Sequence, residues 1–122
     1  MITLRRDIEI LQGSTFYQDI WFLSSANAAI DMSAYTAAIQ IRSDYDDGEL
    51  LVDGTTANGI LEFHADGDQG KLTIMISSAI TELLEVDGSV RQAVYDLEIT
   101  SAAGETTQIY AGNCDIRKNI TI

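Results

Sequence analysis

The sequence predicts an all-β protein, an immunoglobulin-like antiparallel sandwich of about seven strands, with a closed barrel as the second candidate. Apolar stretches of strand length recur roughly every 10 to 15 residues along the chain. Turn dipeptides such as Asp53-Gly54, Asn58-Gly59 and Asp87-Gly88 separate them, and glycine tolerates the positive φ that tight hairpins need. Within the stretches, apolar and polar residues alternate, which is typical of strands with one buried face.

The alternation identifies the strands individually. Between residues 35 and 43, Ala37, Ile39 and Ile41 share one face, and polar residues occupy much of the other. The same pattern recurs in three further sets: Leu72, Ile74 and Ile76; Tyr95, Leu97 and Ile99; and Ile8 with Ile10. Four strands of this kind predict antiparallel sheets with one face in water.

Residues 77–86 break the rhythm and predict one short helix. Ile80, Leu83 and Leu84 follow helical spacing, and Ser77 or Ser78 can act as the N-cap. The helix would form a corner between two strands and end near Asp87-Gly88.

Composition predicts one acidic domain spanning residues 1–122. The chain has 122 residues, 46% of them hydrophobic, and a formal net charge of -12, which is enough apolar material for an independent core. So much negative charge argues against binding to nucleic acid or to an anionic membrane. We expect neither a membrane span nor a secretion signal, and the single cysteine, Cys114, cannot form a disulfide within the chain. We therefore expect synthesis in a reducing cytoplasm.

The residues that carry chemistry do not form a recognisable catalytic motif. His64 is the single histidine, and we expect it to be a surface residue at a strand end. Cys114 is expected to be a buried strand residue, although a reactive thiol stays conceivable. We therefore expect a protein that is not an enzyme, with no catalytic residue, cofactor or metal.

The acidic loop is the exception. Asp44, Asp46, Asp47 and Glu49 are the densest group of carboxylates, but their spacing does not fit an EF-hand. Whether they bind a cation or belong to a solvated hairpin is left open.

Two groups of residues are candidates for partner binding. The first group lies on one strand: if Phe16, Ile20 and Phe22 face the core, the opposite face of the strand carries Tyr17, Trp21 and Leu23. These outward residues are then either covered by a loop or helix of the same chain or buried by another protein. The opposite register would instead expose Phe16 and Phe22. The second group is basic and lies near the two ends of the chain. It consists of Arg5, Arg6, Arg117 and Lys118. If the first and last strands adjoin, these residues form a basic edge; scattered solvated charge is the alternative.

The order of several short motifs resembles the small β-sandwich domain of tailed-bacteriophage tail and baseplate proteins, and is similar to the amino-terminal domain of upper-baseplate proteins. The motifs are Ile8-x-Ile10-x-Gln12-Gly13-x-Thr15-Phe16, Ile30-Asp31-Met32-Ser33-x-Tyr35-Thr36, Ile39-x-Ile41-Arg42, Gly70-Lys71-Leu72-Thr73, Ile80-Thr81-x-Leu83 and Tyr95-Asp96-Leu97-Glu98-Ile99. The chain lacks the proline that often precedes the second motif, and we expect no fibre or receptor-binding extension after Ile122.

The resemblance implies a virion structural protein of the tail or baseplate. Such a protein would act as an adaptor that docks neighbouring tail or fibre proteins, as a homo-oligomer or ring within the particle. A carbohydrate- or calcium-binding sandwich module is the alternative.

Overall fold

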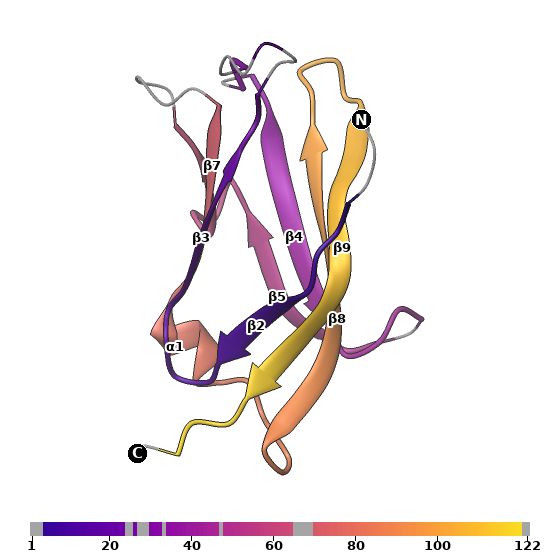
Figure 1. Ribbon diagram of the computed structural model, residues 1–122. Coiled ribbons are helices and arrows are strands. Elements are labelled where there is room, and N and C mark those ends of the chain that lie inside the picture. The colour runs from indigo at the N-terminus through magenta and orange to yellow at the C-terminus, as the bar shows by residue number, and fades with distance from the viewer. Residues whose placement is uncertain are drawn as a thin grey trace.

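The protein is a β-sandwich of two facing sheets, seen in the computed structural model of Figure 1. The structure describes residues 4–23, 26, 30–32, 34–46, 48–64 and 70–120. Within these residues the elements are β1 (Leu4–Arg5), β2 (Ile8–Leu11), β3 (Phe16–Trp21), β4 (Thr36–Arg42), β5 (Leu50–Thr55), β6 (Leu61–Phe63), β7 (Lys71–Ile76), α1 (Ser78–Thr81), β8 (Val90–Thr100) and β9 (Thr106–Arg117). The expected sandwich is thus confirmed, with nine strands among the described residues where about seven were expected.

Six strands form the larger layer, which we call the large sheet. Its order is β1-β9-β8-β4-β5, and β2 also pairs with β9. The first and last strands therefore adjoin, but β1 and β2 run parallel to β9, whereas the sequence predicted antiparallel sheets. Gly112 of β9 permits this close approach, because a Cβ at that position would collide with the backbone carbonyl of Arg6, between β1 and β2.

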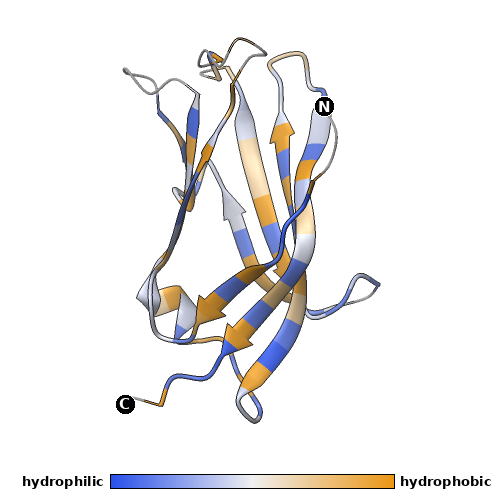
Figure 2. Ribbon diagram, in the orientation of Figure 1, coloured by the Kyte–Doolittle hydropathy of each residue, from blue (hydrophilic) through white to orange (hydrophobic). Residues whose placement is uncertain are grey.

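The other layer, which we call the small sheet, has the antiparallel order β3-β7-β6. The core lies between the two sheets and is filled by the residues that alternation assigned to it. Ile39, Ile41, Leu72, Ile76 and Leu97 are each completely buried. Figure 2 shows the hydropathy changing from residue to residue along several strands, as half-buried strands require.

The helix α1 lies at the lower end of the small sheet in Figure 1 and is shorter than expected. It covers four residues, because the backbone then tightens into three-residue turns, in which the amides of Leu83 and Leu84 bond the carbonyls of Ile80 and Thr81. Leu84 is buried, but Leu83 is 76% exposed, so its expected place on the apolar helix face is wrong. No helix in the described part of the chain is long and apolar enough to cross a membrane.

Candidate functional site

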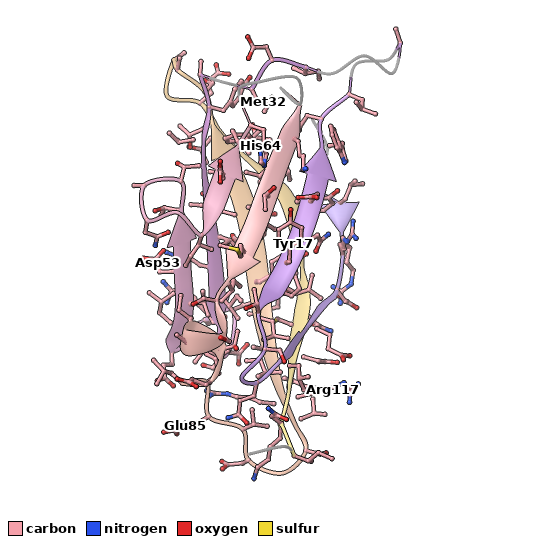
Figure 3. The ribbon with its side chains drawn as sticks, turned by 90° about the vertical axis from the view of Figure 1, so that its left-hand side faces the viewer. Tyr17, Met32, Asp53, His64, Glu85 and Arg117 are labelled. Atoms are coloured by element: carbon pink, nitrogen blue, oxygen red, sulfur yellow. The ribbon has the colours of Figure 1, made fainter. Side chains whose placement is uncertain are left out.

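The outer face of the small sheet carries exposed apolar side chains on two neighbouring strands. Tyr17 and Trp21 project from β3, and Met75 of β7 lies directly opposite Tyr17. They are 57%, 50% and 47% exposed, respectively. Figure 3 looks onto this face, with Tyr17 and His64 labelled on it.

The register of β3 is the first of the two considered from the sequence. Ile20 and Phe22 are 6% and 8% exposed, while Tyr17, Trp21 and Leu23 are on the outside. Phe22 packs near Phe63 of β6, with ring centroids 6.3 Å apart. This contact across the small sheet keeps Phe22 inside and therefore keeps Trp21 in solvent.

Between these apolar groups lies a hydrogen-bonded chain that crosses the small sheet. Thr73 of β7 is only 7% exposed, and its hydroxyl donates to Oδ1 of Asp19 over 2.7 Å. Nε2 of His64 lies 2.8 Å from the same hydroxyl oxygen. An ionised carboxylate only accepts, so the Thr73 proton is committed to Asp19 and Nε2 of His64 must be the donor in its own bond.

Lys71 joins this chain to Trp21. Its Nζ is 3.6 Å from Oδ2 of Asp19 and 5.6 Å from the centroid of the Trp21 ring. The hydrogen bond from Thr73 holds the pKa of Asp19 below its usual value of 3.8, and the positive charge of Lys71 acts in the same direction, while partial desolvation of the carboxylate opposes both. The carboxylate is therefore a stable ion that fixes Lys71 beside the indole ring.

This arrangement does not match a hydrolytic triad, although it contains a hydroxyl, an imidazole and a carboxylate. A triad places the imidazole in the middle, where it takes the proton of the hydroxyl. Here the hydroxyl of Thr73 lies between His64 and Asp19 and gives its proton to the carboxylate. The three residues can position one another, but they do not activate Thr73 as a nucleophile.

An apolar hollow of about 290 Å³ adjoins this face at the edge strand β3. Trp21 and Leu23 line one side of it, and Leu4 and Tyr110 of the large sheet line the other, with Ile30. Trp21 therefore belongs both to the outer face of the small sheet and to the hollow.

The basic candidates do not gather into one edge. Arg5 lies beside Ala111 and Arg117 beside Leu11, so the two are six residues apart along β9, about 20 Å. Each pairs with an acid of the same edge: Arg5 with Asp7 over 3.4 Å, and Arg117 with Glu9 over 2.8 Å.

The other two basic candidates are engaged locally. The guanidinium of Arg6 lies 5.8 Å from the centroid of the Tyr110 ring, and the backbone amide of Lys118 donates to the Ser89 carbonyl. The structure thus brings Tyr17 and Trp21 together and leaves the four basic residues distributed along β9.

The acidic loop does not assemble a cation site in the part of the chain that is described. Oδ1 of Asp44 accepts the amide of Tyr45, and Glu49 pairs with Arg91 over 3.5 Å. Among the described residues, no three histidine, cysteine or acidic side chains come close enough to hold a metal. Asp47 and Ser33 lie outside the described residues.

Cys114 and His64 are placed differently from each other. Cys114 is completely buried in β9, as expected, and burial raises the pKa of its thiol to about 12. His64 follows β6, as expected for a strand-end residue, but it is half-buried and bonded to Thr73.

Sequence reasoning missed Asp19, Lys71 and Thr73. Asp19 shares a strand face with Tyr17 and Trp21, and Lys71 and Thr73 share one with Met75, which the period of two would indicate. What the period cannot indicate is that β3 and β7 are neighbours, or that Asp19 lies opposite Thr73.

Comparisons with known proteins do not assign the chain to a family. No family model matches the sequence, and no curated protein matches it. Among solved structures, the chain is similar to CopC from Methylosinus trichosporium OB3b, with 12% sequence identity and a TM-score of 0.45. The similarity covers 94% of this chain and 89% of CopC.

These comparisons contradict the expected role as a bacteriophage tail or baseplate adaptor. No family model or curated protein connects the chain with a tail protein, and CopC is one of the solved structures similar to it. The physical reason is that the motifs behind the resemblance, such as Gly13-x-Thr15 and Tyr95-Asp96-Leu97, specify a turn and a half-buried strand. Residues of that kind define a sandwich and carry no information about its partner.

Proposed function

We propose that the protein is a non-enzymatic binding protein that associates with a second copy of itself through the outer face of the small sheet. The observation that carries this proposal is a nearly neutral, aromatic face on a strongly acidic chain. The described residues of this face include one cation, Lys71, and two carboxylates, Asp19 and Glu62. Their sum is -1, and two of these three charges, Asp19 and Lys71, are paired with each other.

Charge favours this face for self-association. Two copies that each carry -12 repel each other, and the repulsion is strongest where acidic surfaces meet. The Asp19–Lys71 pair is neutral, so contact between two such faces brings little like charge together.

The apolar groups on this face suit the centre of an interface. Tyrosine, tryptophan and methionine are enriched there, and the two aromatic side chains bury much area while losing little rotamer freedom. Trp21 is already held by Lys71, so less conformational entropy is lost when a partner packs against the ring.

The size of the face predicts weak association. β3 and β7 have six residues each and β6 has three, so the face spans at most roughly 14 by 20 Å, about 280 Å² per copy. A stable interface buries about 800 Å² per partner. Even with the neighbouring hollow included, we expect dimers that form only at high protein concentration.

The experiment is sedimentation velocity over a concentration series, combined with fluorescence. Trp21 is the only tryptophan in the sequence, so its emission reports directly on the proposed interface. We expect the weight-average mass to rise with concentration while the emission of Trp21 shifts to shorter wavelength and becomes less accessible to acrylamide.

Tyr17→Ala is the test variant and Tyr45→Ala is its matched control. Both remove a tyrosine side chain of similar exposure, 57% and 64%, but Tyr45 lies in the β4–β5 loop. Tyr17→Ala should weaken dimerisation about tenfold and Tyr45→Ala should leave it unchanged. A monomer at every concentration, with constant Trp21 emission, would overturn the proposal.

A further inference from the structure

The first observation is that β8 extends past the end of β4. β4 pairs with β8 from Thr36 opposite Thr100 to Arg42 opposite Val94. The first residues of β8, Val90–Ala93, pair with β9 on one side, and among the described residues no strand pairs with them on the other. Figure 1 shows this lower part of β8 running beyond β4. The result is a short strand edge within the large sheet.

The second observation is a hollow of about 490 Å³ at the same place, which we call the β4-end groove. It lies between the start of β5, with Leu50 and Leu51, and the segment that runs from α1 into β8, with Leu83, Leu84 and Val90. Leu83 is 76% exposed and Leu50 is 42% exposed. The groove therefore occupies the path that β4 would follow if it continued.

The third observation is the charge around the β4-end groove. Glu49, Glu85, Asp87 and Arg91 line it, three acids and one base, which sum to -2. The base is already compensated, because Arg91 pairs with Glu49 over 3.5 Å and donates to the Glu85 carbonyl. This rim favours a positively charged occupant.

We infer that the β4-end groove binds an extended segment of a partner protein in which basic residues alternate with apolar ones. The segment adds to the edge of Val90–Ala93 as a short strand in line with β4. Its apolar side chains enter between Leu50 and Leu83, and its basic side chains reach the carboxylates of the rim. The Glu49–Arg91 pair crosses the groove, but Glu49 is 73% exposed, so opening such a surface pair costs little.

The strand edge is the reason to expect an extended occupant. A helix has satisfied its own backbone and would leave the edge of Val90–Ala93 unpaired, whereas an extended segment gains main-chain hydrogen bonds and side-chain contacts together. The charge argues against a second copy as the occupant, since another acidic chain would meet the acidic rim. The inference is independent of the proposed self-association, which uses the nearly neutral outer face of the small sheet.

The test uses a short synthetic peptide of alternating lysine and valine with capped ends, titrated against the full chain. Two matched peptides serve as controls: one has glutamate in place of lysine, and one has N-methylated backbone amides on the edge that would pair. We expect the lysine peptide to bind, the glutamate peptide to fail, and N-methylation to weaken binding at least about tenfold. Hydrogen exchange should show new protection at amides within Val90–Ala93.

Leu50→Ala and Leu11→Ala are the matched protein variants. Both leucines lie on edge strands and are 42% and 44% exposed, so neither change should unfold the domain, which a melting curve checks. Leu50→Ala should weaken peptide binding about tenfold, and Leu11→Ala should not. Equal binding of the methylated peptide without new protection would show general electrostatic attraction only and overturn the inference.

The salt dependence of binding distinguishes failure of the inferred peptide binding from failure of the proposed self-association. Peptide binding should weaken as salt rises, because opposite charges attract in this case. Self-association should strengthen, because salt screens repulsion between two acidic copies. Either response can therefore fail while the other holds.

Discussion

Replacing Thr81 with valine should destabilise the sandwich, because its hydroxyl fastens the helical corner to a distant turn. Thr81 is completely buried, and its Oγ1 donates to the Ser14 carbonyl over 2.8 Å, across 67 residues of sequence. The side-chain amide of Gln12 makes a similar bond to the Leu84 carbonyl over 2.7 Å. Together the two bonds hold α1 against the β2–β3 turn, and they position the Leu83–Leu84 side of the β4-end groove.

The magnitude follows from what valine removes and what it keeps. Valine has nearly the shape of threonine, so no cavity forms, but the Ser14 carbonyl loses its donor. A half-buried carbonyl left without a partner costs about 1–2 kcal/mol. With 122 residues, the entropy of unfolding is roughly 0.26 kcal/mol per kelvin, so Tm should fall by about 4–8 °C.

The assay is urea unfolding monitored by circular dichroism, with thermal melting as a second measurement. Thr106→Val is the control, because Thr106 is exposed and its hydroxyl bonds the hydroxyl of Thr100 at the surface of the β8–β9 hairpin. The control should change the free energy of unfolding by less than about 0.5 kcal/mol. If Thr81→Val matched the control, the bond to Ser14 would not hold the corner, and the reasoning would be refuted.

Two further predictions concern Thr73 and Cys114. Thr73→Val removes the hydrogen bond that lowers the pKa of Asp19. A lowered carboxyl pKa stabilises the folded state above pH 3.8, and this stabilisation is lost as pH falls through the folded pKa. Urea unfolding at several pH values should therefore show a variant that is less stable than the native protein near neutral pH and similar to it in acid. Cys114, with its pKa at about 12 and no exposed surface, should react with a disulfide reagent at least about a thousandfold more slowly in the native protein than in urea; rapid labelling of the native protein would contradict the burial of β9.

The sequence was sufficient to predict the layers of the fold because apolar and polar residues alternate along the strands, which identifies the buried face of each strand. Ile39, Leu72 and Leu97 are core residues for the same reason that their neighbours are polar: a strand has two faces and only one is buried here. The direction of β1 and β2 was not predictable in this way. Parallel pairing with β9 depends on the close approach at Gly112, and a contact between residues so far apart in sequence leaves no periodic signal.

The candidate sites also differ in whether they depend on local sequence or on the pairing of distant strands. Tyr17 and Trp21 could be identified because both faces of their strand are apolar, which is a local property. The chain from His64 through Thr73 to Asp19 depends on which strands are neighbours and on their register. Leu83 was misplaced because helical spacing was extended beyond Thr81, where the backbone changes to tighter turns and rotates that side chain into solvent.

The distribution of charge links the two surfaces. On an acidic chain, an exposed apolar sheet face is better suited to contact between copies where its charges are paired with each other. On the small sheet, Lys71 neutralises Asp19 and stands beside Trp21, so charge is removed where aromatic surface is exposed. At the β4-end groove the opposite holds: apolar surface is exposed inside a rim that stays acidic. Like copies meet little repulsion at the first surface, whereas a basic segment is attracted to the second, so the two kinds of binding need not compete.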